Sequence, residues 1–373
     1  MFKYPPIFVD TTLRDGEQAS GVAFTLNEKV ELIGMLSRAG ITEFEVGTPA
    51  MGRDAIKEIK AIVNSGVRGR KIAWCRAKEV DIELAQRCGV DGVHLSFPLS
   101  DRLLTAMGKS REWVLDEVCR VVSHAYESFD FVSIGAQDSS RADRAFLMEF
   151  IERVKESGAK RVSIADTVGI LNPFSTRSLI ASIRAAAPDL SIVFHAHNDL
   201  GMACANSLSA WMAGADALST TINGLGERAG NAPFEEVVMA IEKSVGLPLM
   251  IQKSALPKIC SFVEHISGRQ NSPSKPIVGE LSLTHESGIH TKYLQRDRST
   301  YQLFAAEEIG LREQRFRIGK HTCIATLRAA LEDLGVLCRD EIMPRLLDEV
   351  RRWCTIHKRD LTTEELVMIY KAI

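Results

Sequence analysis

Short apolar runs alternate with longer amphipathic segments through the first two thirds of the chain. The short runs are four to six residues long, and polar residues or glycines follow them, as is typical of buried parallel strands. The predicted strands span residues 7–10, 43–46, 71–75, 92–97, 131–135, 161–165, 191–194 and 217–222.

Segments with the 3.6-residue spacing of helices follow these strands. Examples are residues 27–39, 55–64, 112–128, 142–157 and 235–245. Gly40 and Gly158 stand where glycine ends a helix, and Pro173 stands where proline begins one. Eight strand–helix units within about 250 residues predict an α/β fold of the (β/α)8 TIM-barrel type. An open doubly wound sheet is less favoured, because the chain has neither a G-x-G-x-x-G fingerprint nor a Walker A loop.

The alternation stops at Pro248. The remaining residues contain helical segments around a loop-rich stretch at 268–319, in which Ser-Pro-Ser-Lys-Pro at 272–276 resembles a hinge. We therefore expect a catalytic TIM-barrel domain over residues 1–248. Residues 249–373 are expected to form a mainly helical lid or dimerisation region.

The composition is that of an ordinary soluble protein. The 373 residues are 45% hydrophobic and 25% charged, with a formal charge of −2, which does not suggest a nucleic-acid partner. No apolar run approaches the about 18 residues of a membrane span, and the N-terminus lacks a signal peptide, so we expect a cytoplasmic protein. The eight cysteines include no C-x-x-C pair, which argues against a zinc knuckle and a disulfide scaffold.

Two histidines end the predicted seventh strand. Side chains on a strand alternate between its faces, so His195 and His197 project from the same face. A single strand histidine is more often an ordinary hydrogen-bonded polar residue than a ligand. A same-face pair followed directly by Asn198 and Asp199 favours a metal site, because imidazole is the commonest metal ligand.

The active site of a TIM barrel lies at the carboxyl ends of its strands. The polar residues found there include Arg14, Asp15, Gln18, Glu45, Arg76, His94, Gln137, Asp138, Thr167, Glu227, Arg228 and Asn231. Only strand 8 separates strands 1 and 7, so Asp15 and Asn231 are our candidates for the other ligands. Their alternative roles are a surface turn for Asp15 and a helix N-cap for Asn231. Mixed oxygen and nitrogen ligation suits Zn²⁺, Mn²⁺ or Mg²⁺, and the sequence does not select among them.

Arg14 stands beside the candidate ligand Asp15. Its guanidinium suits the carboxylate and ketone oxygens of a 2-oxo acid bound to the metal. The alternative is a structural ion pair with Glu45 or Glu17, and the two roles are compatible. A metal and an arginine on a ketone oxygen stabilise a developing alkoxide, which carbon–carbon bond formation at that carbonyl requires.

The motifs along the chain together resemble one enzyme family. They are DTTLRDGEQ (10–18), HAHND (195–199), NGLGERAGN (223–231), THESGIH (284–290) and IGKH (318–321). They resemble, in this order and over essentially the whole chain, the homocitrate, isopropylmalate and citramalate synthases. GTPAMG (47–52), WCR (74–76), ADTVG (165–169) and VGELSLTHESGIH (278–290) look most like the homocitrate synthases of nitrogen fixation.

The resemblance implies an acyltransferase reaction of the Claisen type, in which acetyl-CoA condenses with a metal-bound 2-oxo acid and the thioester is hydrolysed. The acceptor would be 2-oxoglutarate and the product homocitrate. The implied roles are metal ligation for Asp15, His195, His197 and Asn231, substrate binding for Arg14, Gln18, His94 and Thr167, and catalysis for Arg14, His290 and Tyr301. Glu45 and Arg76 complete our candidates for substrate binding, and Gln137 completes those for catalysis. Arg76 and Ser133 are the candidate partners for the distal carboxylate of 2-oxoglutarate. His290 matches a histidine that family members deliver from the partner subunit, with Tyr301 assisting, which implies a homodimer.

One residue departs from the family pattern. Many members carry a glutamate where this chain has Gln137, and an amide cannot act as a carboxylate base. Several alternatives therefore stay open: an isopropylmalate or citramalate synthase, an acyl-CoA lyase or aldolase on a related barrel, a metal-dependent hydrolase using the His-x-His pair, and a binding protein on an inactivated barrel.

Overall fold

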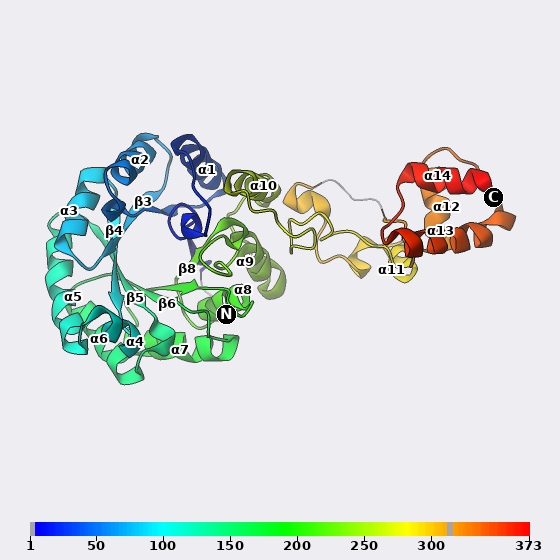
Figure 1. The fold of residues 1–373 in the computed structure, drawn as a ribbon. Helices are drawn as coiled ribbons and strands as arrows, with labels where there is room; N and C mark the ends of the chain where they lie inside the picture. The colour runs from blue at the N-terminus through cyan, green and yellow to red at the C-terminus, as the bar shows by residue number, and fades with distance from the viewer. Residues whose placement is uncertain (1–3, 312–315) are drawn as a thin grey trace. The chain divides into compact units, whose positions relative to one another are not determined.

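The computed structural model describes residues 4–311 and 316–373. Within them, eight parallel strands close into a barrel in chain order, and β8 pairs with β1 (Figure 1). The strands are β1 (Ile7–Asp10), β2 (Glu43–Gly47), β3 (Arg70–Arg76), β4 (Gly92–Pro98), β5 (Phe131–Gln137), β6 (Arg161–Asp166), β7 (Ser191–Ala196) and β8 (Ala217–Thr220). The predicted TIM barrel is confirmed.

Each predicted strand coincides with an observed one, and every strand end lies within two residues of its prediction; β8 ends two residues earlier than predicted. The chain leaves the sheet after Thr220 because a 3-10 turn, Ile222–Gly224, begins there. Asn223 adopts the left-handed conformation, with φ 60°, and the Ile222 amide donates to Thr12 Oγ1 instead of to a strand.

Helices surround the barrel. They are α1 (Leu26–Ala39), α2 (Arg53–Asn64), α3 (Glu79–Cys88), α4 (Asp101–Met107), α5 (Arg111–Tyr126), α6 (Arg144–Glu156), α7 (Pro173–Ala186), α8 (Ala203–Met212), α9 (Phe234–Ala240) and α10 (Leu256–Ser267). Helix α1 begins at a capping box formed by Thr25 and Glu28, and it ends at Gly40 with φ 107°. Pro173 opens α7 behind the N-cap Asn172, as predicted.

The main core lies between the strands and the helices. Phe97 of β4 packs against Phe150 of α6 with ring centroids 5.9 Å apart, and both side chains are fully buried. Because helices cover the outer face of every strand while the barrel interior covers the inner face, these strands are buried on both sides. This explains why they occur in the sequence as nearly continuous apolar runs.

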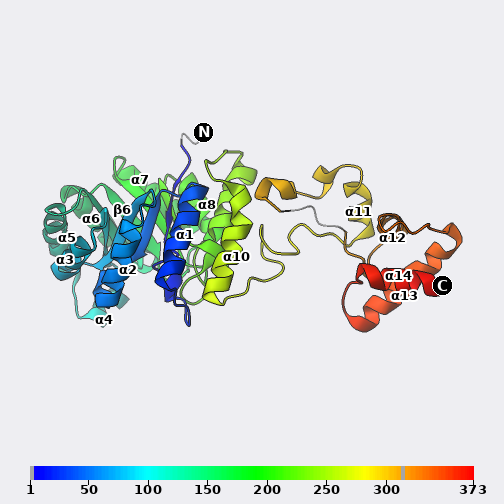
Figure 2. The same cartoon turned by 90° about the horizontal axis from the view of Figure 1, so that it is seen from above.

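The chain divides into two compact units after Asn271. Helix α10 belongs to the first unit, where it packs against α1 (Figure 2), whereas the predicted boundary at residue 248 precedes that helix. The second unit contains α11 (Gly288–Leu294), α12 (Ile324–Glu332), α13 (Met343–His357) and α14 (Thr363–Ala372). Its core includes the fully buried Leu327, Leu346 and Leu366. Part of the predicted loop-rich stretch, residues 312–315, lies outside the described residues.

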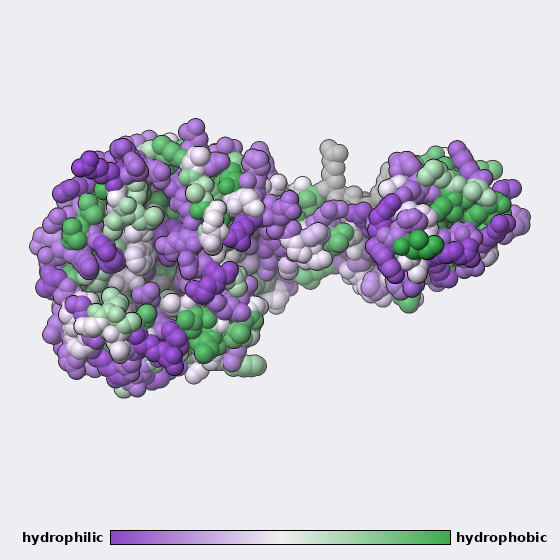
Figure 3. Space-filling view, viewed as in Figure 1, coloured by the Kyte–Doolittle hydropathy of each residue, from purple (hydrophilic) through white to green (hydrophobic). Residues whose placement is uncertain are grey.

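Apolar groups interrupt a mainly hydrophilic surface in the view of Figure 3. Among the residues that the structure describes, no helix combines the length and the apolar character that crossing a bilayer demands.

Candidate active site

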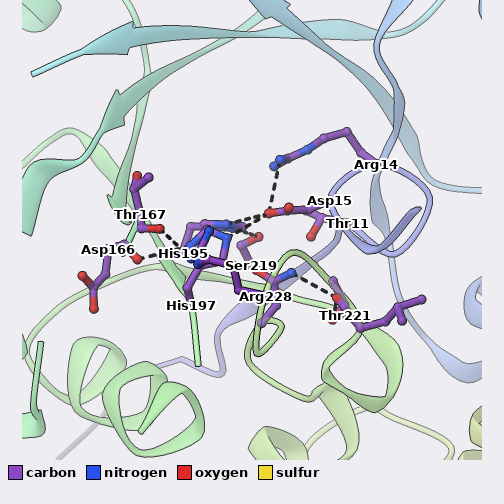
Figure 4. Close-up of polar contacts among 12 residues, drawn as sticks. Thr11, Arg14, Asp15, Asp166, Thr167, His195, His197, Ser219, Thr221 and Arg228 are labelled. Atoms are coloured by element: carbon purple, nitrogen blue, oxygen red, sulfur yellow. Dashed lines mark hydrogen bonds and ion pairs between the residues drawn. The ribbon is translucent and has the colours of Figure 1, made fainter. Parts of the chain in front are cut away.

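One carboxylate and two imidazoles meet at the carboxyl end of the barrel. His195 Nε2 lies 2.9 Å and His197 Nε2 lies 3.6 Å from Asp15 Oδ2, and all three side chains are buried. His195 is the penultimate residue of β7, His197 follows that strand, and Asp15 lies in the loop after β1. Figure 4 shows both rings facing the carboxylate. Three potential ligand atoms within 4.8 Å of one another match the geometry of a metal site.

The outer nitrogen of each ring has a partner that sets its orientation. His197 Nδ1 lies 3.2 Å from the Asp166 carbonyl oxygen, which only accepts, so Nδ1 carries the proton in the neutral ring. His195 Nδ1 lies 2.7 Å from Ser219 Oγ. In this neutral form the Nε2 of His197 has a free lone pair that faces a carboxylate oxygen 3.6 Å away, so the two atoms can ligate one cation together. The contacts thus fit a bound metal ion.

The charge states also suit metal binding. Burial alone would raise the pKa of Asp15, but the Arg14 guanidinium, 3.3 Å away, and the two imidazoles hold that pKa well below its usual range. Burial lowers the pKa of His195, although Asp15 opposes this effect. At neutral pH the cluster therefore presents an ionised carboxylate and a neutral imidazole, which are the forms that ligate metals.

Asn231 lies next to this cluster through an antiparallel bridge with His197. Its Nδ2 donates to the Leu225 carbonyl at 3.0 Å, while its Oδ1 is buried without a hydrogen-bond partner among the described residues. A Cβ at Gly226 would lie 2.1 Å from Asn231 Nδ2, so the loop needs glycine there to hold the amide. The N-cap of α9 is Pro233, which leaves the N-cap alternative for Asn231 without support. An unpaired buried oxygen is suited to a fourth ligand.

Arg14 forms one of the two ion pairs that the sequence suggested. Its Nε lies 2.7 Å from Glu45 Oε2, and its guanidinium also lies 5.9 Å from the centre of the Trp74 ring. Glu17 instead pairs with Lys29 at 2.8 Å. Glu45 therefore holds the Arg14 guanidinium beside Asp15. In this position the N–H groups of Arg14 can bind Glu45 and a ligand at the same time.

A cavity of about 260 Å³ opens inside the barrel next to the cluster. Its lining contains five of the six predicted substrate-binding residues, namely Arg14, Gln18, Glu45, His94 and Thr167, together with Gln137, which was predicted to be catalytic. Arg76 does not line it, because its side chain is half exposed and forms a two-pronged ion pair with Asp81 at 2.8 and 2.9 Å. The volume suits a small acid and not a complete acyl-CoA.

His94 forms part of the cavity wall. Its Nδ1 lies 3.2 Å from Ser133 Oγ, and burial lowers its pKa to about 4 although Glu45 opposes the shift. A Cβ at Gly135 would lie 2.4 Å from His94 Nε2, so the neighbouring strand makes room for the ring with a glycine. His94 is therefore a neutral hydrogen-bonding group at physiological pH.

His290 and Tyr301 belong to the second unit. Their rings stack with centroids 4.1 Å apart and an interplanar angle of 22°, so the structure does bring this predicted pair together. Tyr301 is 43% exposed.

Two cavity residues escaped the sequence reasoning. Ser219 orients His195, and Arg161 lies at the start of β6. The alternation of side chains along a strand could have revealed Arg161, because it places Arg161 on the same strand face as Ser163 and Ala165. A charged residue inside a buried strand requires a partner.

The closed parallel barrel with this buried cluster at its carboxyl end defines a TIM-barrel protein with a candidate metal centre. Comparison with protein families identifies the class more closely, since the HMGL-like family matches residues 5–263. A second match, described as homocitrate synthase post-HMGL domain-like, spans residues 277–358. The chain belongs to the HMGL-like family.

Similar proteins include the 2-isopropylmalate synthase 2 of Caldanaerobacter subterraneus subsp. tengcongensis, with 41% identity over 99% of this chain and 96% of the relative. Homocitrate synthase 1 of Nostoc sp. is 42% identical over 97% of this chain and 96% of its own length. Among solved structures, hydroxymethylglutaryl-CoA lyase from Pseudomonas aeruginosa shares the fold, with a TM-score of 0.63 and 20% identity over 74% of this chain and 97% of that one. The predicted family is confirmed. Because the similar proteins are synthases of this family, the chain is an enzyme.

Proposed function

We propose that the protein condenses acetyl-CoA with a 2-oxo acid in a metal-dependent reaction, with 2-oxoglutarate as acceptor and homocitrate and CoA as products. The observation that carries the proposal is the buried cluster of Asp15, His195 and His197 beside Arg14, at the mouth of a cavity of about 260 Å³. This arrangement suits a small chelating acid whose ketone oxygen gains negative charge.

Asp15, His195 and His197 hold the divalent cation, with Asn231 Oδ1 as the fourth ligand. When bound, the cation supplies positive charge beside the acceptor's ketone oxygen. Arg14 donates hydrogen bonds to the same oxygen, and Glu45 fixes the guanidinium for this task. Gln18, His94 and Thr167 line the rest of the acceptor site.

His290 is our proposed base, assisted by Tyr301, with which it stacks. It takes a proton from the methyl group of acetyl-CoA, and the resulting carbanion forms a bond to the ketone carbon of the acceptor. The ketone oxygen becomes an alkoxide and takes up the proton that His290 removed from the methyl group, which regenerates the base. Water then hydrolyses the thioester and CoA leaves as the thiol. Gln137 lines the cavity but accepts no proton, so its part is limited to hydrogen bonding.

In this proposal the protein is a homodimer in which His290 acts in the partner's site. The barrel over residues 1–248 is the catalytic domain, and the region from 249 onward supplies the lid and the dimer contacts. The nitrogen-fixation type of homocitrate synthase and a cytoplasmic location complete the proposal. The motifs at 47–52, 74–76, 165–169 and 278–290 support that subtype.

The test is a CoA-release assay with acetyl-CoA and a panel of acceptors: 2-oxoglutarate, pyruvate, 2-oxoisovalerate, oxaloacetate and glyoxylate. Chelated protein should be inactive, and Zn²⁺, Mn²⁺ or Mg²⁺ should restore turnover. Asp15→Asn is the matched control, because it keeps the shape of the side chain and removes its charge. Turnover with 2-oxoisovalerate or pyruvate alone would instead support the isopropylmalate or citramalate alternative. Absence of CoA release with every acceptor and metal would refute the proposal.

A further inference from the structure

A buried arginine lies deep in the barrel, away from the candidate metal centre. Arg161 is 5% exposed and lines the same cavity as Arg14 and His195. In the sheet, Ala165 pairs with His195, and Arg161 precedes Ala165 by four residues. Its Cα therefore lies about 13 Å further down the strand. The mechanism proposed above does not use this residue.

Arg161 belongs to a charged group in which Arg161 and Glu43 are buried, whereas the second arginine, Arg70, has a side chain that is 39% exposed. Its guanidinium donates through both terminal nitrogens to Glu43, and the Nη2–Oε1 distance is 3.2 Å. Arg70 binds the same carboxylate, with its Nη1 2.8 Å from Glu43 Oε1. Two guanidinium groups thus share one carboxylate. A buried cation that is only partly compensated favours an anion beside it.

Arg161 also has donors to spare for a ligand. A guanidinium carries five N–H bonds, and the contacts to Glu43 use one on each terminal nitrogen. On the neighbouring strand, Ser133 pairs with Arg161 in the sheet register and places a hydroxyl in the same cavity. The Ser133 hydroxyl contacts His94, which burial keeps neutral at physiological pH.

We propose that Arg161, assisted by Ser133, binds the distal anionic group of the acceptor and so selects a 2-oxo acid with a second acidic group. The inference rests on the proposed function. The acid's ketone and first carboxylate lie at the Asp15, His195 and His197 cluster, and its chain runs down the barrel toward β5 and β6. The structure thus assigns acceptor selection to a residue outside the candidate metal centre.

The experiment measures acceptor binding by calorimetry, with a saturating divalent metal and no acetyl-CoA. The probes are 2-oxoglutarate and 2-oxovalerate, which have the same number of carbons and differ in the distal carboxylate. The wild-type protein should bind 2-oxoglutarate about 10- to 100-fold more tightly, as charge-assisted hydrogen bonds predict. Arg161→Gln should bring the two affinities to within about threefold, with little change for 2-oxovalerate.

Arg161→Gln leaves Glu43 paired with Arg70, so Glu43 is not left as an isolated buried charge. If that variant does not fold, Arg161→Met combined with Glu43→Gln removes both charges and should show the same loss of preference. Equal weakening of both acids would indicate a purely structural role and overturn the inference. A wild-type preference for 2-oxovalerate, or binding of neither acid, would also overturn it. Preferential 2-oxoglutarate binding without CoA release would refute the proposed function and leave the anion site standing.

Discussion

Gly135 of β5 allows a sharp test of the cavity wall. In Gly135→Ala the added Cβ would lie 2.4 Å from His94 Nε2 and 3.0 Å from His94 Cε1. The first distance is at least 1.0 Å shorter than an ordinary contact, which begins at 3.4 Å. His94 is buried and is held by Ser133, so its ring cannot turn aside freely.

The expected result is a loss of about 1–3 kcal/mol in the free energy of unfolding, the usual cost of overpacking a core. The displaced ring would also narrow the cavity, and the proposed function then predicts a higher KM for the 2-oxo acid. Urea denaturation measures the first effect, and CoA release at varied acceptor concentration measures the second.

The matched control is Gly34→Ala in α1. A Cβ there would meet only the flexible end of Arg38 at 3.3 Å and the edge of Val67 at 3.9 Å. Because alanine is the better helix former, this variant should be stabilised by about 0.5–1 kcal/mol. A Gly135→Ala protein with wild-type stability and KM would show that His94 does not occupy the position described, and the reasoning would fail.

Three further predictions concern the candidate metal centre and the cavity wall. Asp15→Asn should lower the affinity for a divalent metal by about 100-fold. Calorimetry with the metal alone measures this loss, and an unchanged affinity would contradict the prediction. Ser219→Ala should lower that affinity by about tenfold, because the partner of His195 Nδ1 is lost; Ser163→Ala, in the same cavity, should leave metal affinity at the wild-type value. Burial lowers the pKa of His94 to about 4, so between pH 6.5 and 4 the unfolded chain binds a proton there that the folded chain does not. The stability associated with neutral His94 is complete above pH 6.5 and is lost as pH falls, by about 1.4 kcal/mol per unit, until pH 4. Denaturation curves of His94→Gln over this range should show a correspondingly smaller acid loss, and identical slopes would contradict the assignment.

The repeating pattern of strands and helices was determined by the sequence alone. Periods of two and 3.6 residues, glycines after helices and proline at a helix start are local properties, so they can be recognised without knowledge of the fold. The same is true of the side chains that end each strand. Once a barrel was predicted, Asp15, His195 and His197 had to lie at one end of it, although Asp15 lies 180 residues before His195.

The tertiary structure decided which of the polar residues on the strands line the shared cavity and which bind partners elsewhere. Arg76 is the last residue of β3, and Glu45 lies two residues before the end of β2. Arg76 nevertheless binds Asp81, a partner five residues away that the start of α3 supplies. Arg161 lies at the beginning of a strand and was not predicted to matter, because its partner Glu43 is 118 residues away and meets it only across the closed barrel. Local spacing predicts the position of a residue on its strand or helix. Packing and the distribution of buried charge decide which groups its side chain contacts. The sequence therefore predicted the candidate metal centre, and only the folded barrel revealed the guanidinium deep in the same cavity.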